Sequence, residues 1–203
     1  MLRVPDLFYS LSRCPICKTR PSSAEGCCSA CAAALFSPHM EGFELALGRY
    51  EGRLERAIRA FKFHGVTRLG VLFGEEIASA VRGSGWRPDL ICPLPLHTGR
   101  RLERGYNQSA VITRTAAQRL NVAHSHALGR TRATQQQARL GESERQQNVT
   151  GAFRAKPLRG ERVLLVDDVT TSGATLTEGS LALLEAGASR VYLAVVAKAS
   201  RER

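Results

Sequence analysis

Long hydrophobic runs are missing from this sequence of 203 residues. A helix that crosses a bilayer needs about 20 consecutive apolar residues, and no stretch of the chain approaches that length. The first residues, MLRVPDLFYSLSR, also lack the apolar centre that a secretory signal peptide needs. We therefore expect a cytoplasmic protein with no segment inserted in a membrane.

Aromatic residues and lysines are both scarce. Aromatic side chains make up 6% of the chain, so the sequence does not indicate the stacking platform that single-strand nucleic-acid binders use. Four lysines stand among 29 basic residues, and the formal net charge of +11 is therefore carried by arginine. Arginine binds phosphate groups through two parallel hydrogen bonds, so this composition suits polyanionic partners. Arginine-rich codon usage without functional meaning is the alternative.

Cysteine is nearly absent outside one short segment. CPIC and CSAC form two CxxC units within 18 residues, a pattern that suits a closed tetrahedral Zn²⁺ site. Disulfide frameworks are typical of small secreted chains, so we predict a structural zinc module over residues 1–45. The predicted ligands are Cys14, Cys17, Cys28 and Cys31. Cys27 competes with its neighbour for the third position, and buried thiols or a redox pair are the alternatives to zinc.

Strands alternate with helices from about residue 46 onward. Apolar residues at helical spacing predict helices in RLERAIRAFKFHG, LGVLFGEEIASAVRGSG, NQSAVITRTAAQRLN and SGATLTEGSLALLEAGA. Strands are predicted in PDLICPLPL, RVLLV and RVYLAVVAKA, and Cys92 is expected to be a small core residue at a strand end. This alternation is typical of an α/β domain, so we predict a parallel twisted sheet flanked by helices over residues 46–203.

The stretch RVLLVDDVTTSGATL, residues 162–176, carries the strongest functional pattern. Asp167 and Asp168 follow an apolar strand, and ligands of open parallel sheets bind at the carboxyl ends of strands. Hydroxyl side chains, Gly173 and a helix start come next, which together suit a phosphate. Carboxylates accept hydrogen bonds from sugar hydroxyls, so the pattern predicts a ribose 5-phosphate site. A helix cap with two solvated acids is the alternative. The residues of this predicted site are Asp167, Asp168, Val169, Thr170, Thr171, Ser172, Gly173, Ala174 and Thr175.

A basic stretch, HTGRRLERG, follows the first predicted strand of the α/β domain. Guanidinium groups suit the several charges of a pyrophosphate. A basic helix start on the surface is the alternative. The candidate pyrophosphate ligands are His97, Arg100, Arg101 and Arg104. Asn107 and Gln108 are candidates for capping the helix that comes next.

Residues 131–153 are polar, Gln-rich and basic. The segment is too long for an ordinary connection in an α/β domain. We predict a lid that closes over the site and excludes water, with a surface excursion as the alternative. Its candidate residues, with the preceding arginine, are Arg130, Arg132, Gln137, Arg145 and Asn148.

Four motifs and the Cys-rich start resemble known families. VLLVDDVTTSGAT is similar to the phosphoribosyl pyrophosphate site of type I phosphoribosyltransferases. CPLPLHTGRRLERGYNQ, LGRTRATQQQARLGESERQQNVTGAF, YEGRLERAIRAFKFHG and the Cys-rich start resemble the ComF-like competence proteins in the same order. The resemblance implies the type I phosphoribosyltransferase fold for the second domain.

The resemblance also implies ligands and roles. Phosphoribosyl pyrophosphate and Mg²⁺ are the implied ligands, with Asp167, Asp168, Arg130 and Arg132 at the reacting centre. The implied role is the import of single-stranded DNA in natural transformation, with a helicase or channel of the uptake machinery as partner. Two alternatives stay open: a phosphoribosyltransferase of nucleotide salvage that acts on a small base, and a ligand-sensing regulator. Whether catalysis occurs is left open by the sequence.

Overall fold

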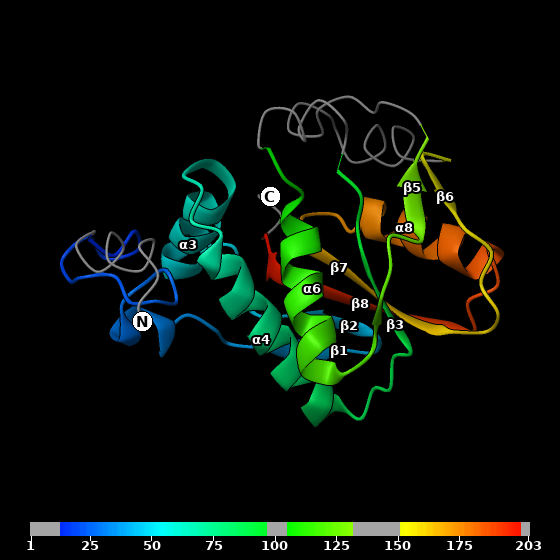
Figure 1. Ribbon diagram of the computed structural model, residues 1–203, viewed down its shortest axis with the longest axis horizontal. Helices are drawn as coiled ribbons and strands as arrows, with labels where there is room; N and C mark the ends of the chain where they lie inside the picture. Colours follow the sequence, from blue (N-terminus) through cyan, green and yellow to red (C-terminus); the bar gives the residue numbers. More distant parts are fainter. Residues whose placement is uncertain (1–12, 97–104, 132–150, 200–203) are drawn as a thin grey trace, which may run out of the picture.

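The computed structural model describes residues 13–96, 105–131 and 151–199, and it is an α/β protein built on one main sheet (Figure 1). The two long strands, β7 and β8, lie at its centre. In chain order the elements are α2 Ser29–Ala32, β1 His39–Glu41, β2 Glu44–Ala46, α3 Gly52–Phe63, α4 Arg68–Ser84, β3 Leu90–Pro93, α6 Gln108–Leu120, β4 Ala123–His124, β5 Leu128–Arg130, β6 Phe153–Ala155, β7 Arg162–Thr170, α8 Ala174–Glu185 and β8 Arg190–Lys198.

The main sheet has six strands in the order β1-β2-β8-β7-β3-β4. All neighbouring pairs are parallel except β1 and β2, which form an antiparallel hairpin at one edge. Strands β5 and β6 form a separate antiparallel pair that packs against α8. The parallel α/β architecture expected from the alternating pattern is confirmed.

Two hydrophobic clusters cover the two faces of the sheet. On β7, Leu164 and Val166 pack with residues of α3, α4 and α6, whereas Val163 and Leu165 pack with residues of α8. Successive side chains of a strand point to opposite faces, so a strand covered on both sides is apolar at every position. This is why the run VLLV is continuous, and all four residues are fully buried.

Helices α4 and α6 pack closely because of a glycine. A Cβ atom added at Gly74 of α4 would lie 2.5 Å from the carbonyl oxygen of Ile112 and 2.7 Å from Thr115 Cβ, both on α6. Only glycine permits this approach. The contact fixes α6, whose first turn reaches the carboxyl end of β7.

The cysteine segment packs against the main domain. Ile16 and Cys14 belong to the same buried cluster as Leu54 and Phe61 of α3. The Arg56 side chain donates from Nε to the carbonyl oxygen of Ile16 at 2.9 Å. The division of the chain between residues 45 and 46 stays a prediction, and this position falls inside β2, which pairs with β8 in the main sheet.

Within the described part of the chain, no helix has the length and the apolar character needed to cross a membrane.

Candidate functional site

The sequence suggested that the two acids follow a strand. The structure places both of them inside strand β7. β7 runs on through Asp167, Asp168 and Val169 to Thr170, because β8 continues to pair with it as far as Lys198. The acids therefore occupy the carboxyl end of a central strand. This is the edge at which parallel α/β sheets bind ligands.

Asp168 forms a buried ion pair with a lysine from the last turn of α3. Lys62 Nζ lies 2.7 Å from Asp168 Oδ1, and the two side chains are 13% and 8% exposed. A buried carboxylate without a partner is costly, so Lys62 keeps Asp168 in one position. Helix α3 is held in turn by a hydrogen bond from the Tyr106 hydroxyl to the carbonyl oxygen of Phe61.

Asp167 is anchored by the first turn of α6. Ser109 Oγ donates to Asp167 Oδ1 at 2.9 Å, and the Asp168 amide donates to the same oxygen at 2.8 Å. Burial raises the pKa of Asp167 to about 7, and the neighbouring negative charge of Asp168 acts in the same direction. Among the described residues, the contacts of both carboxylates fall on Oδ1, so Oδ2 of each is the oxygen that can face a ligand.

The hydroxyl loop, Thr171–Ser172–Gly173, connects β7 to α8. Gly173 has a φ of 80° and stands directly before the first helical residue, Ala174. This left-handed conformation favours glycine and turns the chain from β7 into α8. Thr171 is exposed, and Ser172, Gly173 and Thr175 are partly exposed. A positive helix end and nearby hydroxyls form an arrangement that can bind a phosphate.

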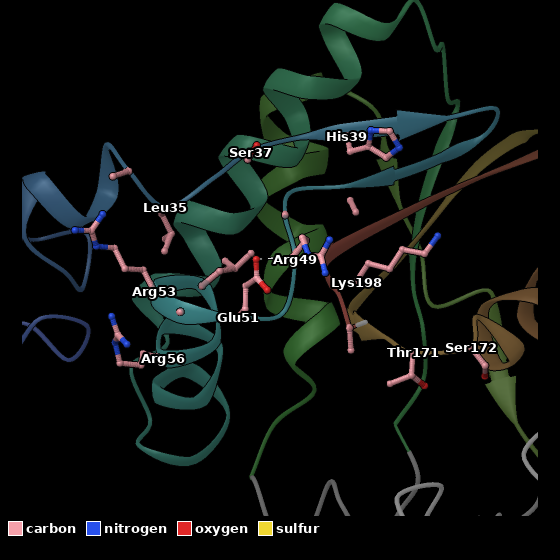
Figure 2. A pocket seen from close by; sticks show the side chains of 16 residues that line it. Leu35, Ser37, His39, Arg49, Glu51, Arg53, Arg56, Thr171, Ser172 and Lys198 are labelled. Carbon is pink, nitrogen blue, oxygen red and sulfur yellow. Dashed lines mark ion pairs between the residues drawn. The ribbon is translucent and has the colours of Figure 1, made fainter. Parts of the chain in front are cut away.

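A large cavity of about 1340 Å³ opens beside the hydroxyl loop. Figure 2 shows Thr171 and Ser172 at one side of it and Arg53 and Arg56 of α3 at the other. Its further walls come from the β1–β2 hairpin, the end of β8 and the end of the cysteine segment. The remaining lining residues are Ala34, Leu35, Ser37, His39, Ala46, Gly48, Arg49, Glu51, Gly52, Leu54, Lys198 and Ala199.

Four cysteines gather in the N-terminal segment. The sulfur atoms of Cys14, Cys17, Cys28 and Cys31 all lie within 4.8 Å of one another. The Cys17 and Cys28 sulfurs are 3.8 Å apart. This separation fits two ligands of a tetrahedral ion with bonds of about 2.3 Å, as in zinc sites. The donor set therefore suits a closed, four-coordinate metal site.

The local environment separates the ligand candidates from Cys27. The Thr19 hydroxyl lies 3.3 Å from Cys17 Sγ and lowers the pKa of that thiol to about 5. Burial raises the pKa of Cys27 to about 12, but burial also raises the pKa of Cys31, a member of the cluster, to about 12, so it is position and not acidity that distinguishes Cys27. Cys27 lies outside the cluster, and its carbonyl oxygen accepts hydrogen bonds from the amide and hydroxyl of Ser23. Of the two neighbouring thiols, Cys28 is the one that lies in the cluster.

A comparison with protein families decides the family of the chain. The family described as phosphoribosyl transferase domain matches residues 58–203, which include β7, the hydroxyl loop and α8. The chain belongs to the phosphoribosyl transferase domain family.

Relatives of this phosphoribosyl transferase domain protein have competence and DNA utilization names. It is 30% identical to Competence protein F of Haemophilus influenzae over 163 residues, which are 75% of this chain and 71% of that protein. It is 26% identical to Competence protein ComFC of Bacillus subtilis over 180 residues, 86% and 72% of the two chains. The ComF resemblance expected from the motifs is confirmed.

A third relative is matched over a shorter region. The chain is 37% identical to the DNA utilization protein YhgH of Salmonella typhimurium over 128 residues, 62% of this chain. The matched part is 56% of the length of that relative.

The chain is also similar to solved structures, at low sequence identity. The glutamine phosphoribosylpyrophosphate amidotransferase of Bacillus subtilis is 21% identical, with a TM-score of 0.45 over 64% of this chain and 26% of the other. A phosphoribosyltransferase from Corynebacterium diphtheriae is 15% identical, with a TM-score of 0.40 over 85% and 92% of the chains. No residue role follows from similarity at this level.

Several predicted residues of the phosphoribosyl transferase domain lie outside the described ranges. These are His97, Arg100, Arg101, Arg104, Arg132, Gln137, Arg145 and Asn148. Arg130 is described: it ends β5, and its guanidinium lies over the Phe153 ring at 5.2 Å from the ring centre. The expected parts of all these residues in pyrophosphate binding and catalysis stay predictions. Asn107 caps α6, because its side chain accepts a hydrogen bond from the Ser109 amide.

Sequence reasoning did not find Lys62 and Ser109 as site residues. Lys62 lies more than 100 positions before Asp168, and Ser109 lies 58 positions before Asp167. A lone lysine at the end of an otherwise amphipathic helix was the available signal, because its neighbours Phe61 and Ile58 belong to the buried face. The cavity had no signal in the sequence, since it is formed by four separate segments.

Proposed function

We propose that the chain binds phosphoribosyl pyrophosphate with Mg²⁺ at the carboxyl end of β7 and acts in the import of single-stranded DNA during natural transformation. One observation carries the ligand assignment: Asp167 and Asp168 end a central parallel strand directly beside the hydroxyl loop and the N-terminus of α8. The family match over residues 58–203 supports the same ligand.

Each part of the site has a role in holding this ligand. The hydroxyl loop and the first amides of α8 bind the 5-phosphate. Oδ2 of Asp167 and of Asp168 accept hydrogen bonds from the two ribose hydroxyls. Lys62 and Ser109 act through the carboxylates, because they fix Oδ1 of each and thereby direct Oδ2 toward the sugar.

The residues present suit Mg²⁺. Carboxylate oxygens are hard donors, and Mg²⁺ in phosphate sites keeps several waters while one or two carboxylates and the substrate phosphates hold it. Asp167 and Asp168 are the described residues that can take part, directly or through water. When bound, the ion neutralises charge on the pyrophosphate and sugar oxygens.

The cysteine cluster is proposed to hold a structural Zn²⁺. Four thiolates fill a tetrahedral shell and leave no open position, so the ion stabilises the segment and does no chemistry. Its packing beside α3 supports a role in keeping that helix, and with it Lys62, in place.

The biological part of the proposal rests on the relatives. Two of them have competence proteins as their names, and a third is named a DNA utilization protein. A cytoplasmic location, contact with incoming single-stranded DNA and contact with a helicase or channel of the uptake machinery are parts of this proposal. The net charge of +11 is compatible with a phosphate-rich partner.

The ligand proposal is tested by calorimetric titration with phosphoribosyl pyrophosphate in the presence of Mg²⁺. We expect saturable binding by the natural chain and a loss of affinity of at least tenfold in the double variant Asp167→Ala, Asp168→Ala. Asp89→Ala is the matched control, because Asp89 pairs with Arg162 at the opposite end of β7. Equal affinity of the double variant and the natural chain would overturn the site assignment.

The biological proposal is tested by transformation frequency in the natural host. Deletion of the gene is expected to lower the frequency, the natural chain to restore it and the double aspartate variant to fail. Restoration by the double variant would separate the DNA role from the ligand site.

A phosphoribosyltransferase of nucleotide salvage is the second candidate, because the cavity beside the hydroxyl loop leaves room for an acceptor. In that reaction the lone pair of an acceptor nitrogen forms a bond to C1 of the ribose, and pyrophosphate leaves with the electrons of the C1–O bond. Incubation with phosphoribosyl pyrophosphate, Mg²⁺ and individual bases tests this. Pyrophosphate release with one base would favour salvage over DNA import.

A further inference from the structure

The cavity beside the hydroxyl loop has a strongly basic lining. Among the described residues, the lining includes four cationic side chains, Arg49, Arg53, Arg56 and Lys198, and one acidic side chain, Glu51. Arg49 pairs with Glu51 at 3.5 Å and Lys198 pairs with Glu44 at 3.0 Å, so Arg53 and Arg56 carry the positive charge that these acids do not offset. A ligand of this cavity therefore meets hydrogen-bond donors with positive charge, which suits an anion.

The size of the cavity argues for a ligand longer than one small molecule. Pockets for small molecules and cofactors measure about 300–1,000 Å³. This cavity measures about 1340 Å³ and extends from Leu35, near the cysteine cluster, past α3 to Ser172 of the hydroxyl loop (Figure 2). Its lining contains no Phe, Tyr or Trp among the described residues, so bases have no aromatic surface on which to stack.

We propose that this cavity binds the phosphates of a single-stranded nucleic acid, and that the strand and phosphoribosyl pyrophosphate exclude each other at the hydroxyl loop. The proposal that a strand binds in the cavity rests only on the basic lining. The second part rests on the proposed function, because Thr171 and Ser172 line the cavity and also belong to the proposed 5-phosphate site. Two phosphate groups cannot share the same hydroxyls, and their negative charges repel.

Binding of this kind has a definite salt dependence. Each phosphate that a cation neutralises on a single strand contributes about −0.7 to the slope of log affinity against log salt concentration. Contacts with Arg53 and Arg56 therefore give a slope of about −1.4, and the absence of stacking makes affinity independent of base sequence.

The first experiment measures fluorescence anisotropy of a labelled thymidine oligonucleotide at several salt concentrations. Arg53→Gln is expected to weaken binding about fivefold at 0.1 M salt and to reduce the slope by about 0.7, since one phosphate contact is lost. Arg59→Gln is the matched control: Arg59 lies on the same helix, pairs with Glu55 and does not line the cavity. Equal affinities of the two variants would overturn the proposal.

The second experiment adds phosphoribosyl pyrophosphate and Mg²⁺ to the oligonucleotide complex. Displacement of the oligonucleotide is expected, and Arg53→Gln is expected to leave phosphoribosyl pyrophosphate affinity, measured by calorimetry, within about twofold. Simultaneous saturation with both ligands would overturn mutual exclusion. Displacement of the oligonucleotide by thymidine monophosphate at the same phosphate concentration would overturn the proposal of a strand, because it would show that the cavity binds a small anion.

The two proposals fail in different ways. If the oligonucleotide depends on Arg53 but calorimetry detects no phosphoribosyl pyrophosphate, the proposed function and mutual exclusion fail and the strand site stands. If phosphoribosyl pyrophosphate binds but Arg53→Gln leaves the oligonucleotide affinity unchanged, the strand site fails and the proposed function stands.

Discussion

At the scale of single residues, the site concentrates negative charge. Asp167 and Asp168 are neighbours on one strand, and one buried cation, Lys62, contacts one of them. These side chains are tolerated in a partly buried place because Lys62 pairs with Asp168 and Ser109 donates to Asp167. Removal of such a partner is therefore expected to lower the stability of the folded protein.

Lys62→Met is expected to destabilise the protein by about 3 kcal/mol or more, because it leaves the Asp168 carboxylate buried without its partner. Lys62→Arg keeps the charge and is expected to lose less. Denaturant unfolding of both variants measures the difference. A Met variant as stable as the natural chain would show that Asp168 does not depend on the ion pair.

Asp167 is expected to make stability depend on pH in an unusual direction. Its folded-state pKa of about 7 lies above the ordinary value of 3.8, so the folded protein binds the proton more tightly than the unfolded chain does. The contribution to stability is complete below pH 3.8 and is lost as the pH rises through 7. Stability of the natural chain relative to Asp167→Asn should therefore fall between pH 4 and pH 7. A constant difference across this range would contradict the raised pKa.

At the scale of elements, the contact between α4 and α6 positions Ser109. Gly74→Ala is expected to cost about 1–3 kcal/mol, because the new Cβ meets the Ile112 carbonyl at 2.5 Å. Gly83→Ala on the same helix is the control: a Cβ there meets nothing within 4 Å, and the variant gains up to about 1 kcal/mol of helix propensity. Thermal unfolding of both variants distinguishes packing from propensity.

The elements show why part of the fold follows from the sequence. Helices α3, α4 and α6 were predicted because each must bury one apolar face, which leaves a period in the sequence. The hairpin β1–β2 and the pair β5–β6 were not, since strands of three residues carry no readable period and depend on distant partners.

The site also has parts that local sequence indicates and parts that depend on distant segments. Asp167, Asp168 and the hydroxyl loop are contiguous, so the sequence indicated them directly. Lys62, Ser109 and the basic cavity come together only through the packing of α3 and α6 against the sheet. The CxxC spacing alone did not decide whether Cys27 or Cys28 is the third metal ligand, because that depends on which side chain points toward the other cysteines.

At the scale of the whole molecule, the cysteine cluster is part of the main core. Cys14 and Ile16 share a hydrophobic cluster with α3, so loss of a metal would affect more than the N-terminal segment. Removal of the metal by a chelator is expected to lower the melting temperature of the entire protein in one transition. A separate early transition, with the main transition unchanged, would show an independent module.

The choice of ligand is testable with two neighbouring cysteines. Cys28→Ala is expected to lose the metal, and Cys27→Ala is expected to retain it, since only the Cys28 sulfur lies with the other three. Mass spectrometry under native conditions measures metal content. Loss of metal from both variants to the same extent would contradict the assignment.

Helix α3 connects two distant places through residues at fixed positions along it. Arg56 Nε contacts Ile16 in the cysteine segment, and Lys62 Nζ contacts Asp168 in the site. One residue inserted between Arg56 and Lys62 would rotate Lys62 about the axis of the helix by roughly 100° and move it about 1.5 Å along the helix. Either contact could then be kept, but not both. Relatives with the same two contacts should therefore keep the spacing of these two positions.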